Sequence, residues 1–244
     1  MLEQVAIAVA FAVGVFSENV FGFGGTIVAM GLLSFMVEPG NIKDLVFVIF
    51  LVTNFSAIAI ALTSWQQIAW RRLWPMLPVS FFGLVLGAHF LHTCTPLLVL
   101  RFFAIFIVVS GCLSLLPRLQ SWRPGIWLRH ILIFCSGVVT GLFGGGGVFA
   151  VLAMRNLLDG KSHFRATMMA FFVFCNVVRG VQYFVQGTFD FGRTAEFWWI
   201  FPPIALAFLL GRKVHVRISE QNFRRGVSLF ILLAGVFMLA KSFS

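Results

Sequence analysis

The chain has 244 residues, of which 60% are hydrophobic and 11% are charged, and its formal net charge is +10. Soluble domains carry about 25% charged residues, so this composition excludes a water-exposed globular fold. Apolar stretches recur along the whole chain and are long enough to cross a bilayer, which takes about 20 residues per helix. The sequence therefore predicts an all-α integral membrane protein with several crossings.

Two glycine-rich interruptions show that the chain repeats itself. We call residues 21–25 (Phe-Gly-Phe-Gly-Gly) break 1 and residues 143–147 (Phe-Gly-Gly-Gly-Gly) break 2; they lie 122 residues apart. The same offset relates Asn54 to Asn176. Further along, an offset of 124 relates four more pairs: Pro78 and Pro202, Gly87 and Gly211, Arg101 and Arg225, Gly111 and Gly235. These matches predict a repeat over 1–116, a cytoplasmic linker over 117–129 and a second repeat over 130–244, forming one transport domain.

Each repeat offers four apolar segments, taken in chain order. They cover 4–37, 45–64, 73–92 and 97–116, and then 126–154, 166–186, 195–211 and 226–240. The chain begins Met-Leu-Glu with no basic residue before its first apolar run, so we expect a membrane-embedded element there and not a cleaved signal peptide.

The first segment of each repeat is too long for one crossing. As a helix, 4–37 would span about 51 Å, against a hydrocarbon core of about 30 Å. Each glycine inside a helix costs about 1 kcal/mol relative to alanine, so the glycine runs predict real interruptions. Two arrangements compete: one long tilted span, or two half-length helices that turn back at the break.

The distribution of positive charge favours the second arrangement. If every segment crosses, the basic residues divide ten to seven between the two sides. If the broken segments turn back, one side collects thirteen: Arg71, Arg72, Arg118, Arg123, Arg129, Arg155, Lys161, Arg165, Arg212, Lys213, Arg217, Arg224 and Arg225. The other side keeps four, Lys43, Arg101, Arg193 and Lys241. The thirteen-to-four division obeys the positive-inside rule better.

Re-entrant hairpins leave three full crossings in each repeat, six in all, with both termini outside the cell. An odd number of crossings makes the second repeat enter from the opposite side, so the two repeats are inverted. Inverted repeats with broken helices are typical of secondary transporters, whose site lies where the breaks meet.

The two breaks are candidate anion sites. The peptide N–H groups of Gly24, Gly25 and Thr26 would be unpaired donors at the start of a half-helix, and a helix N-terminus attracts anions. The same holds at break 2 for three residues: Gly145, Gly146 and Gly147. The alternative is that these glycines only allow close helix packing, as small residues do in membranes.

Four further polar side chains lie at membrane depth. Asn54 and Asn176 could each donate to a ligand oxygen or cap the free groups of the neighbouring break. Arg179 is far from either end of its segment, where charge is expensive and usually functional. Its guanidinium could bind an anionic substrate or form a buried ion pair with Glu18. Glu18 could carry a proton, or serve as a structural partner of Arg179 or of break 1.

The residues that usually hold metals are scattered along the chain. The cysteines stand singly in or beside apolar runs and are expected to be small packing residues: Cys94, Cys112, Cys135 and Cys175. The histidines lie near segment ends and are expected at the membrane interface: His89, His92, His130, His163 and His215. We expect no metal, no cofactor and no nucleic-acid partner.

At its two breaks the sequence resembles the sulfite exporter TauE/SafE family. The matching stretches are 14–25 (Gly-Val-Phe-Ser-Glu-Asn-Val-Phe-Gly-Phe-Gly-Gly) and 137–147 (Gly-Val-Val-Thr-Gly-Leu-Phe-Gly-Gly-Gly-Gly), each followed by an apolar run and an Asn. The resemblance implies a bacterial inner-membrane protein that exports sulfite or a small organosulfonate such as sulfoacetate.

The expected function is therefore export of a small anion by alternating access. An anion channel, or a transporter of a small carboxylate, is the alternative reading. A non-transporting receptor remains a third class, and an enzyme is not expected because no catalytic set converges at one depth. The sequence leaves the oligomeric state open, a homodimer included.

Overall fold

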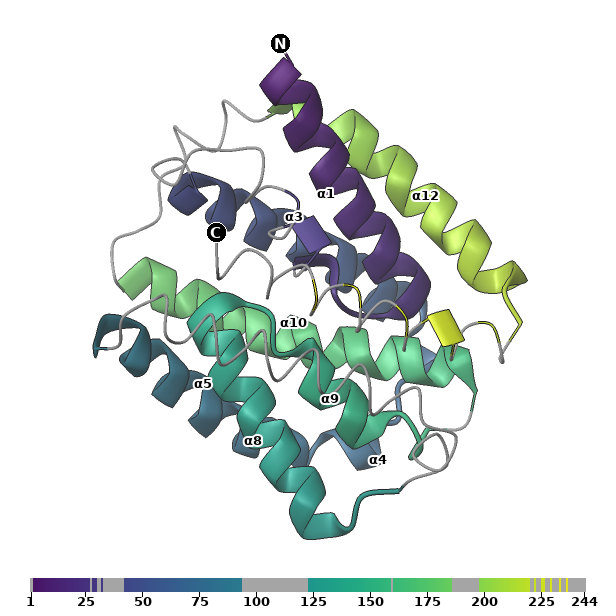
Figure 1. Ribbon diagram of the computed structural model, residues 1–244. Coiled ribbons are helices and arrows are strands. Elements are labelled where there is room, and N and C mark those ends of the chain that lie inside the picture. The colour runs from purple at the N-terminus through teal and green to yellow at the C-terminus, as the bar shows by residue number, and fades with distance from the viewer. Residues whose placement is uncertain are drawn as a thin grey trace.

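Figure 1 shows a computed structural model of the chain. It describes residues 2–26, 28–29, 32, 42–93, 123–158, 160–185 and 198–219, together with single residues beyond 220. Within these ranges every regular element is helical. The longer helices are α1 (Leu2–Phe21), α3 (Ile42–Thr63), α5 (Met76–Thr93), α8 (Ile126–Phe143), α10 (Lys161–Val185) and α12 (Phe201–Arg217). Shorter pieces are α4 (Trp70–Leu73), α9 (Gly147–Met154) and the 3₁₀ turns η1 (Trp65–Gln67) and η2 (Trp198–Ile200).

The predicted segments agree with these helices within a few residues, except at the end of α12. The segment predicted over 195–211 continues as helix to Arg217. The predicted segment 97–116 lies outside the described residues, as does most of 226–240.

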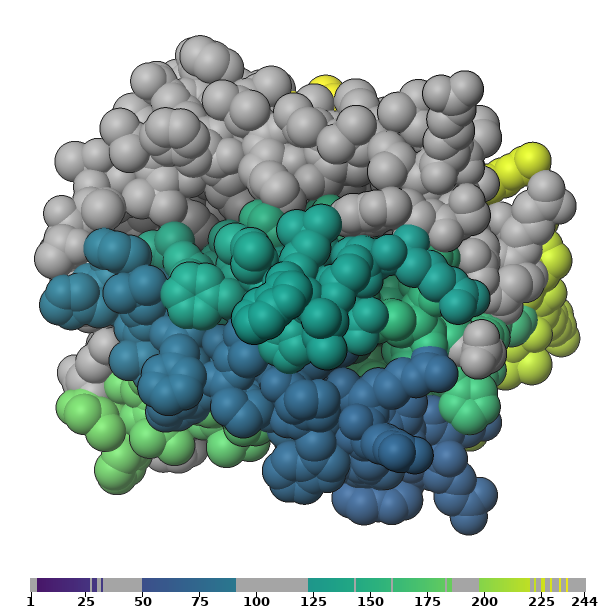
Figure 2. Space-filling model, turned by 90° about the horizontal axis from the view of Figure 1, so that it is seen from below, coloured from purple at the N-terminus to yellow at the C-terminus, as the bar shows by residue number. Residues whose placement is uncertain are grey.

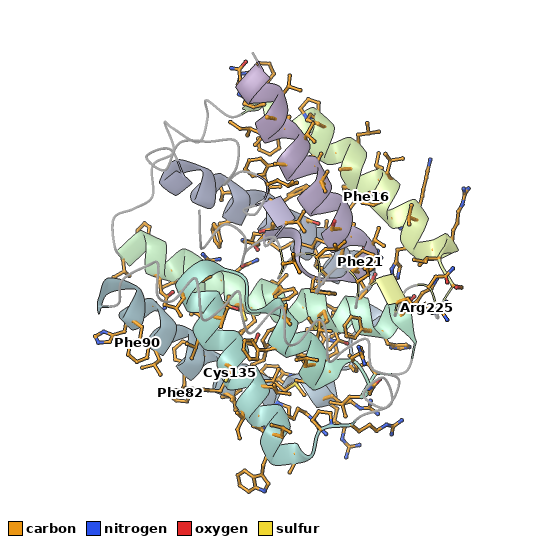
Figure 3. All side chains as sticks on the ribbon, in the orientation of Figure 1. Phe16, Phe21, Phe82, Phe90, Cys135 and Arg225 are labelled. Atoms are coloured by element: carbon orange, nitrogen blue, oxygen red, sulfur yellow. The ribbon has the colours of Figure 1, made fainter. Side chains whose placement is uncertain are left out.

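Several helices have the length and composition of membrane spans. Three apolar stretches are long enough by themselves: Gln4–Phe21, Lys161–Gln182 and Trp198–Arg217. Shorter apolar helices cover Phe50–Thr63, Met76–Phe90 and Ile126–Leu142. Bulky apolar side chains also point outward, such as Phe82 and Phe90 on α5 (Figure 3). The chain is therefore a multi-pass membrane protein whose outer surface is apolar.

The helices form two groups on either side of α10. In Figure 1, α1 and α12 lie side by side on one side of α10, and α5, α8 and α9 lie on the other. Between α1 and α12 lies a buried apolar cluster that includes Phe11, Val15 and Ile204. A larger cluster surrounds α9 and the middle of α10. Helix α10 contributes buried residues to the larger cluster, and it meets the end of α1 through Arg165.

Helices α5 and α8 are in backbone contact through glycines spaced four residues apart on each helix. A β-carbon at Gly83 would overlap the carbonyl oxygen of Phe134, and one at Gly87 would overlap that of Val138. The partner glycines are equally close: a β-carbon at Gly137 or Gly141 would overlap a carbonyl oxygen of α5. Figure 2 shows the two helices side by side without a gap on this face. Small residues at this spacing let membrane helices approach closely.

We expect Gly87→Ala to destabilise the protein although alanine is the better helix former. The new methyl group would force the backbones of α5 and α8 apart, and overpacking of this kind costs about 1–3 kcal/mol. The measurement is the melting temperature in detergent. Gly180→Ala is the matched control, because a β-carbon there meets only the Phe50 ring at an ordinary 3.4 Å. Equal melting temperatures for the two variants would contradict the close packing.

Candidate functional site

Both predicted breaks interrupt the helices, and they do so with the same local geometry. Helix α1 ends at Phe21, and Gly22 follows with φ +80°. Helix α8 ends at Phe143, and Gly144 follows with φ +78°. Each glycine N–H donates to a carbonyl four residues back, Gly22 to Glu18 and Gly144 to Thr140, both at 2.8 Å. Left-handed glycine caps of this kind end helices because glycine has no β-carbon.

After each break the chain folds back on the helix that precedes it. At break 2, Ser136 Oγ donates to the carbonyl oxygen of Gly146 at 2.8 Å, and a β-carbon at Gly146 would overlap Ser136 O. At break 1 the chain is helical again at Gly25, whose β-carbon would lie 3.0 Å from the carbonyl oxygen of Gly14. The glycines therefore allow the returning backbone to lie directly against the first arm.

The two arms of the second hairpin are unequal, and the expectation of two half-length helices is wrong there. Helix α8 has 18 residues, which spans about 27 Å, whereas α9 has 8. The reason is the position of the cap. Gly144, the first glycine of the run, takes the left-handed conformation and ends α8 only after nearly a full membrane thickness.

The two breaks touch each other. A β-carbon at Gly147, the first residue of α9, would lie 3.4 Å from Cβ of Phe23 in break 1 and 3.0 Å from the ring of Phe172 on α10. Gly145, Gly146 and Gly147 are all buried. Two interruptions that lie 122 residues apart in the sequence therefore meet inside the protein, beside the middle of α10.

Arg179 lies at break 2. Its side chain is 6% exposed, and its Nη1 atom is 2.5 Å from the position of a β-carbon on Gly144. The guanidinium carbon is 5.7 Å from the centroid of the Phe50 ring, within cation–π range. A buried cation therefore stands against the backbone where α8 ends. Glu18 instead contacts Gly25 in break 1, so the two charged side chains flank different breaks.

Residues 6–238 match the profile of a known family, sulfite exporter TauE/SafE. The chain belongs to this family. No curated protein and no solved structure matches it. The match covers nearly the whole chain and includes both breaks and Arg179. TauE/SafE proteins are membrane transporters of anions, so the multi-pass helical fold and the contact between the breaks belong to a transporter.

The two repeat-related asparagines of this TauE/SafE chain, Asn54 and Asn176, lie on α3 and α10. Asn176 is 9% exposed and lies one helical turn before Arg179 and one turn after Phe172, on the same face of α10. Asn54 is half-buried, and its Oδ1 atom accepts no hydrogen bond from the described residues. Because Phe172 contacts Gly147 and Arg179 contacts Gly144, Asn176 lies on the face of α10 that borders break 2.

Two basic residues at break 1 are buried. Arg165, which the charge count assigns to the cytoplasmic side, is 8% exposed; its Nη1 donates to Asn19 O at 2.8 Å, and its Cα is 3.1 Å from a β-carbon on Gly22. His215, expected at the membrane interface, is buried, and its Nδ1 donates to Val20 O at 2.8 Å. The last carbonyls of a helix lack intrahelical partners, and these two side chains supply donors.

The same junction is completed by Lys161 in the first turn of α10. Its ammonium donates to the carbonyl oxygens of His215 at 2.9 Å and Val216 at 3.2 Å, and also to that of Ile218. A cation at a helix C-terminus is favourable because of the helix dipole. The start of α10 therefore holds the C-terminal ends of both α1 and α12, next to break 1.

The described residues contain no cluster of three or more His, Cys, Asp or Glu side chains that could hold a metal ion. The candidate site brings together peptide N–H groups, amides and guanidinium groups. These are donors and positive charges suited to an oxyanion.

Proposed function

We propose that the protein exports a small oxyanion, sulfite or an organosulfonate such as sulfoacetate, across the bacterial inner membrane by alternating access. The observation that carries the proposal is the contact between the two breaks beside buried Arg179. A cation this deep in an apolar protein is expensive, and in membrane proteins such residues usually mark substrate pathways. The TauE/SafE match supplies the class of substrate.

The binding site that we propose lies between the breaks. At break 2, the N-terminus of α9 offers the peptide N–H groups of Gly145, Gly146 and Gly147, and Arg179 offers a guanidinium fork that suits sulfonate oxygens. Break 1 contributes the backbone of Gly24, Gly25 and Thr26. Asn54 and Asn176 supply amide donors on either side.

The membrane arrangement that we propose follows from the fold-back at each break. Each repeat, 1–116 and 130–244, consists of a re-entrant hairpin and three crossings, and the cytoplasmic linker 117–129 joins them. The repeats are inverted, and both termini lie on the periplasmic side. The thirteen-to-four division of basic residues between the two faces supports this orientation.

The membrane potential can drive export in this arrangement. Moving one elementary charge across 100 mV is worth about 2.3 kcal/mol, and a negative cytoplasm expels anions. Alternating access requires the two breaks to open toward one side at a time. Because each hairpin is held by backbone contacts such as Ser136 to Gly146, we infer that the hairpins move as units.

The test is flux in proteoliposomes loaded with sulfite, sulfoacetate or a small carboxylate. We expect saturable, slow efflux of the sulfur oxyanions that is accelerated by an inside-negative potential. Single-channel currents would favour an anion channel instead, and a preference for the carboxylate would change the substrate class. Binding without flux would contradict transport altogether.

A further inference from the structure

The two breaks have the same backbone geometry but differ in the side chain that faces the returning arm. Glu18 and Thr140 occupy the same place in the two repeats, 122 residues apart, and the carbonyl oxygen of each accepts a hydrogen bond from the N–H of the glycine cap that follows. A β-carbon at Gly25 would overlap the Glu18 carboxyl group, just as one at Gly146 would overlap the Thr140 hydroxyl group. The side chain that faces the returning arm is therefore an acid at break 1 and a neutral hydroxyl at break 2.

Arg179 is the charged side chain that contacts break 2, as Glu18 contacts break 1. Its repeat equivalent is Ala57 on α3, which is fully buried and carries no charge. Repeat 1 therefore carries the acid and repeat 2 carries the base, and neither charge recurs at the equivalent position of the other repeat. Because the breaks touch at Phe23 and Gly147, an anion held at break 2 would lie next to break 1, which Glu18 flanks.

Within the described ranges, one buried oxygen atom of the Glu18 carboxyl group has no hydrogen-bond partner. Glu18 is 4% exposed, and its Oε2 atom accepts no hydrogen bond from the described residues. The nearby basic side chains are turned to other groups: Arg165 of α10 donates to Asn19 O and His215 of α12 donates to Val20 O. On the α3 side the neighbouring polar contact is neutral, since Asn19 Nδ2 donates to Ser56 Oγ at 2.9 Å.

A carboxylate in such a place would be costly, because burial of an ionised group without a partner strongly favours the neutral form. A neutral carboxyl group beside break 1 removes the repulsion that a carboxylate would exert on an anion between the breaks. The binding of the anion and the binding of the proton are thermodynamically linked. If protonation of Glu18 raises the affinity for the anion by some factor, binding of the anion raises the proton affinity of Glu18 by the same factor.

We propose that Glu18 is a proton-binding site and that one proton moves outward together with each exported anion. This inference rests on the proposed function. While the anion is bound, Glu18 holds a proton that it has taken from cytoplasmic water, and the carboxyl group returns that proton to periplasmic water after the anion leaves. A doubly charged anion then moves with a net charge of −1, and a singly charged anion moves with no net charge.

The experiment uses the full chain in proteoliposomes with a trapped pH-sensitive dye and two substrates, sulfoacetate and the monoanion methanesulfonate. For the wild type we expect proton movement that follows anion movement in a ratio near one. We also expect sulfoacetate flux to respond to membrane potential and methanesulfonate flux not to respond.

In Glu18→Gln, which is permanently neutral, we expect the proton movement per anion to fall at least tenfold while exchange of anion across the membrane persists. Glu18→Thr is the second variant, because threonine already fits the equivalent position in repeat 2, and it should behave in the same way. Thr140→Ser is the control and should keep the wild-type ratio of protons to anions.

Two results would overturn the inference alone: anion flux in the wild type without protons, or an unchanged proton-to-anion ratio in both Glu18 variants. A wild type that moves none of the anions would instead overturn the proposed function, and the inference with it. The two failures are therefore distinguishable in one set of vesicles.

Discussion

Arg179→Ala is expected to reduce flux of sulfite and sulfoacetate roughly 30-fold or more, because loss of one partner of a buried charged contact typically costs about 2–5 kcal/mol. The guanidinium lies against Gly144 and over the Phe50 ring, so it is held in place before the substrate arrives. Alanine would remove both the charge and the fork that matches the oxyanion. The measurement is the initial rate of efflux from proteoliposomes over a range of substrate concentrations.

Arg179→Lys keeps the charge and loses the planar fork, so we expect an intermediate loss of flux with weakened discrimination among oxyanions. Arg71→Ala is the matched control, because Arg71 is an exposed arginine in the short helix α4. Equal flux in Arg179→Ala and Arg71→Ala, with both proteins monodisperse in detergent, would remove Arg179 from the binding site.

Gly146→Ala is expected to open the second hairpin. Gly146 has an ordinary φ of −68°, so backbone strain is not the obstacle. The added methyl group would overlap the carbonyl oxygen of Ser136, which already accepts a hydrogen bond from Thr140 Oγ1 at 2.7 Å. The start of α9 must then move away from α8, which displaces the peptide N–H groups that we assign to the anion.

We expect Gly146→Ala to lower flux at least tenfold and to lower the melting temperature, since overpacking costs about 1–3 kcal/mol. Gly125→Ala serves as the control: Gly125 also has a negative φ, and nothing lies within 4 Å of its β-carbon position. Should Gly146→Ala keep wild-type flux and stability, the tight return of α9 against α8 would be contradicted.

The breaks could be predicted from the sequence because their cause is local. A run of four glycines, or Gly-Phe-Gly-Gly, cannot continue a helix without cost, and the 122-residue offset aligns the two runs. The buried position of Arg179 could be predicted for the same reason. A single cation within a long apolar segment can be recognised from that segment alone. The residue that ends α8 could not be predicted, because four identical glycines give no indication of which one takes the left-handed conformation.

The roles of Arg165 and His215 could not be predicted because their partners are backbone carbonyls. Arg165 donates to an atom of Asn19, 146 positions earlier, and His215 to an atom of Val20, 195 positions earlier. Every residue has a carbonyl group, so the acceptor leaves no mark in the sequence. Both residues also stand near the ends of apolar segments, where basic side chains are usually assigned to water.

Arg165 and Arg179 both lie on α10. They are fourteen residues apart, which corresponds to about 21 Å along the helix axis. Arg165 contacts Gly22, which caps α1, and Arg179 contacts Gly144, which caps α8. Under the alternating access that we propose, a movement of one hairpin would press on the same helix that contacts the other hairpin. We therefore expect α10 to link the movements of the two hairpins directly, without an intervening loop.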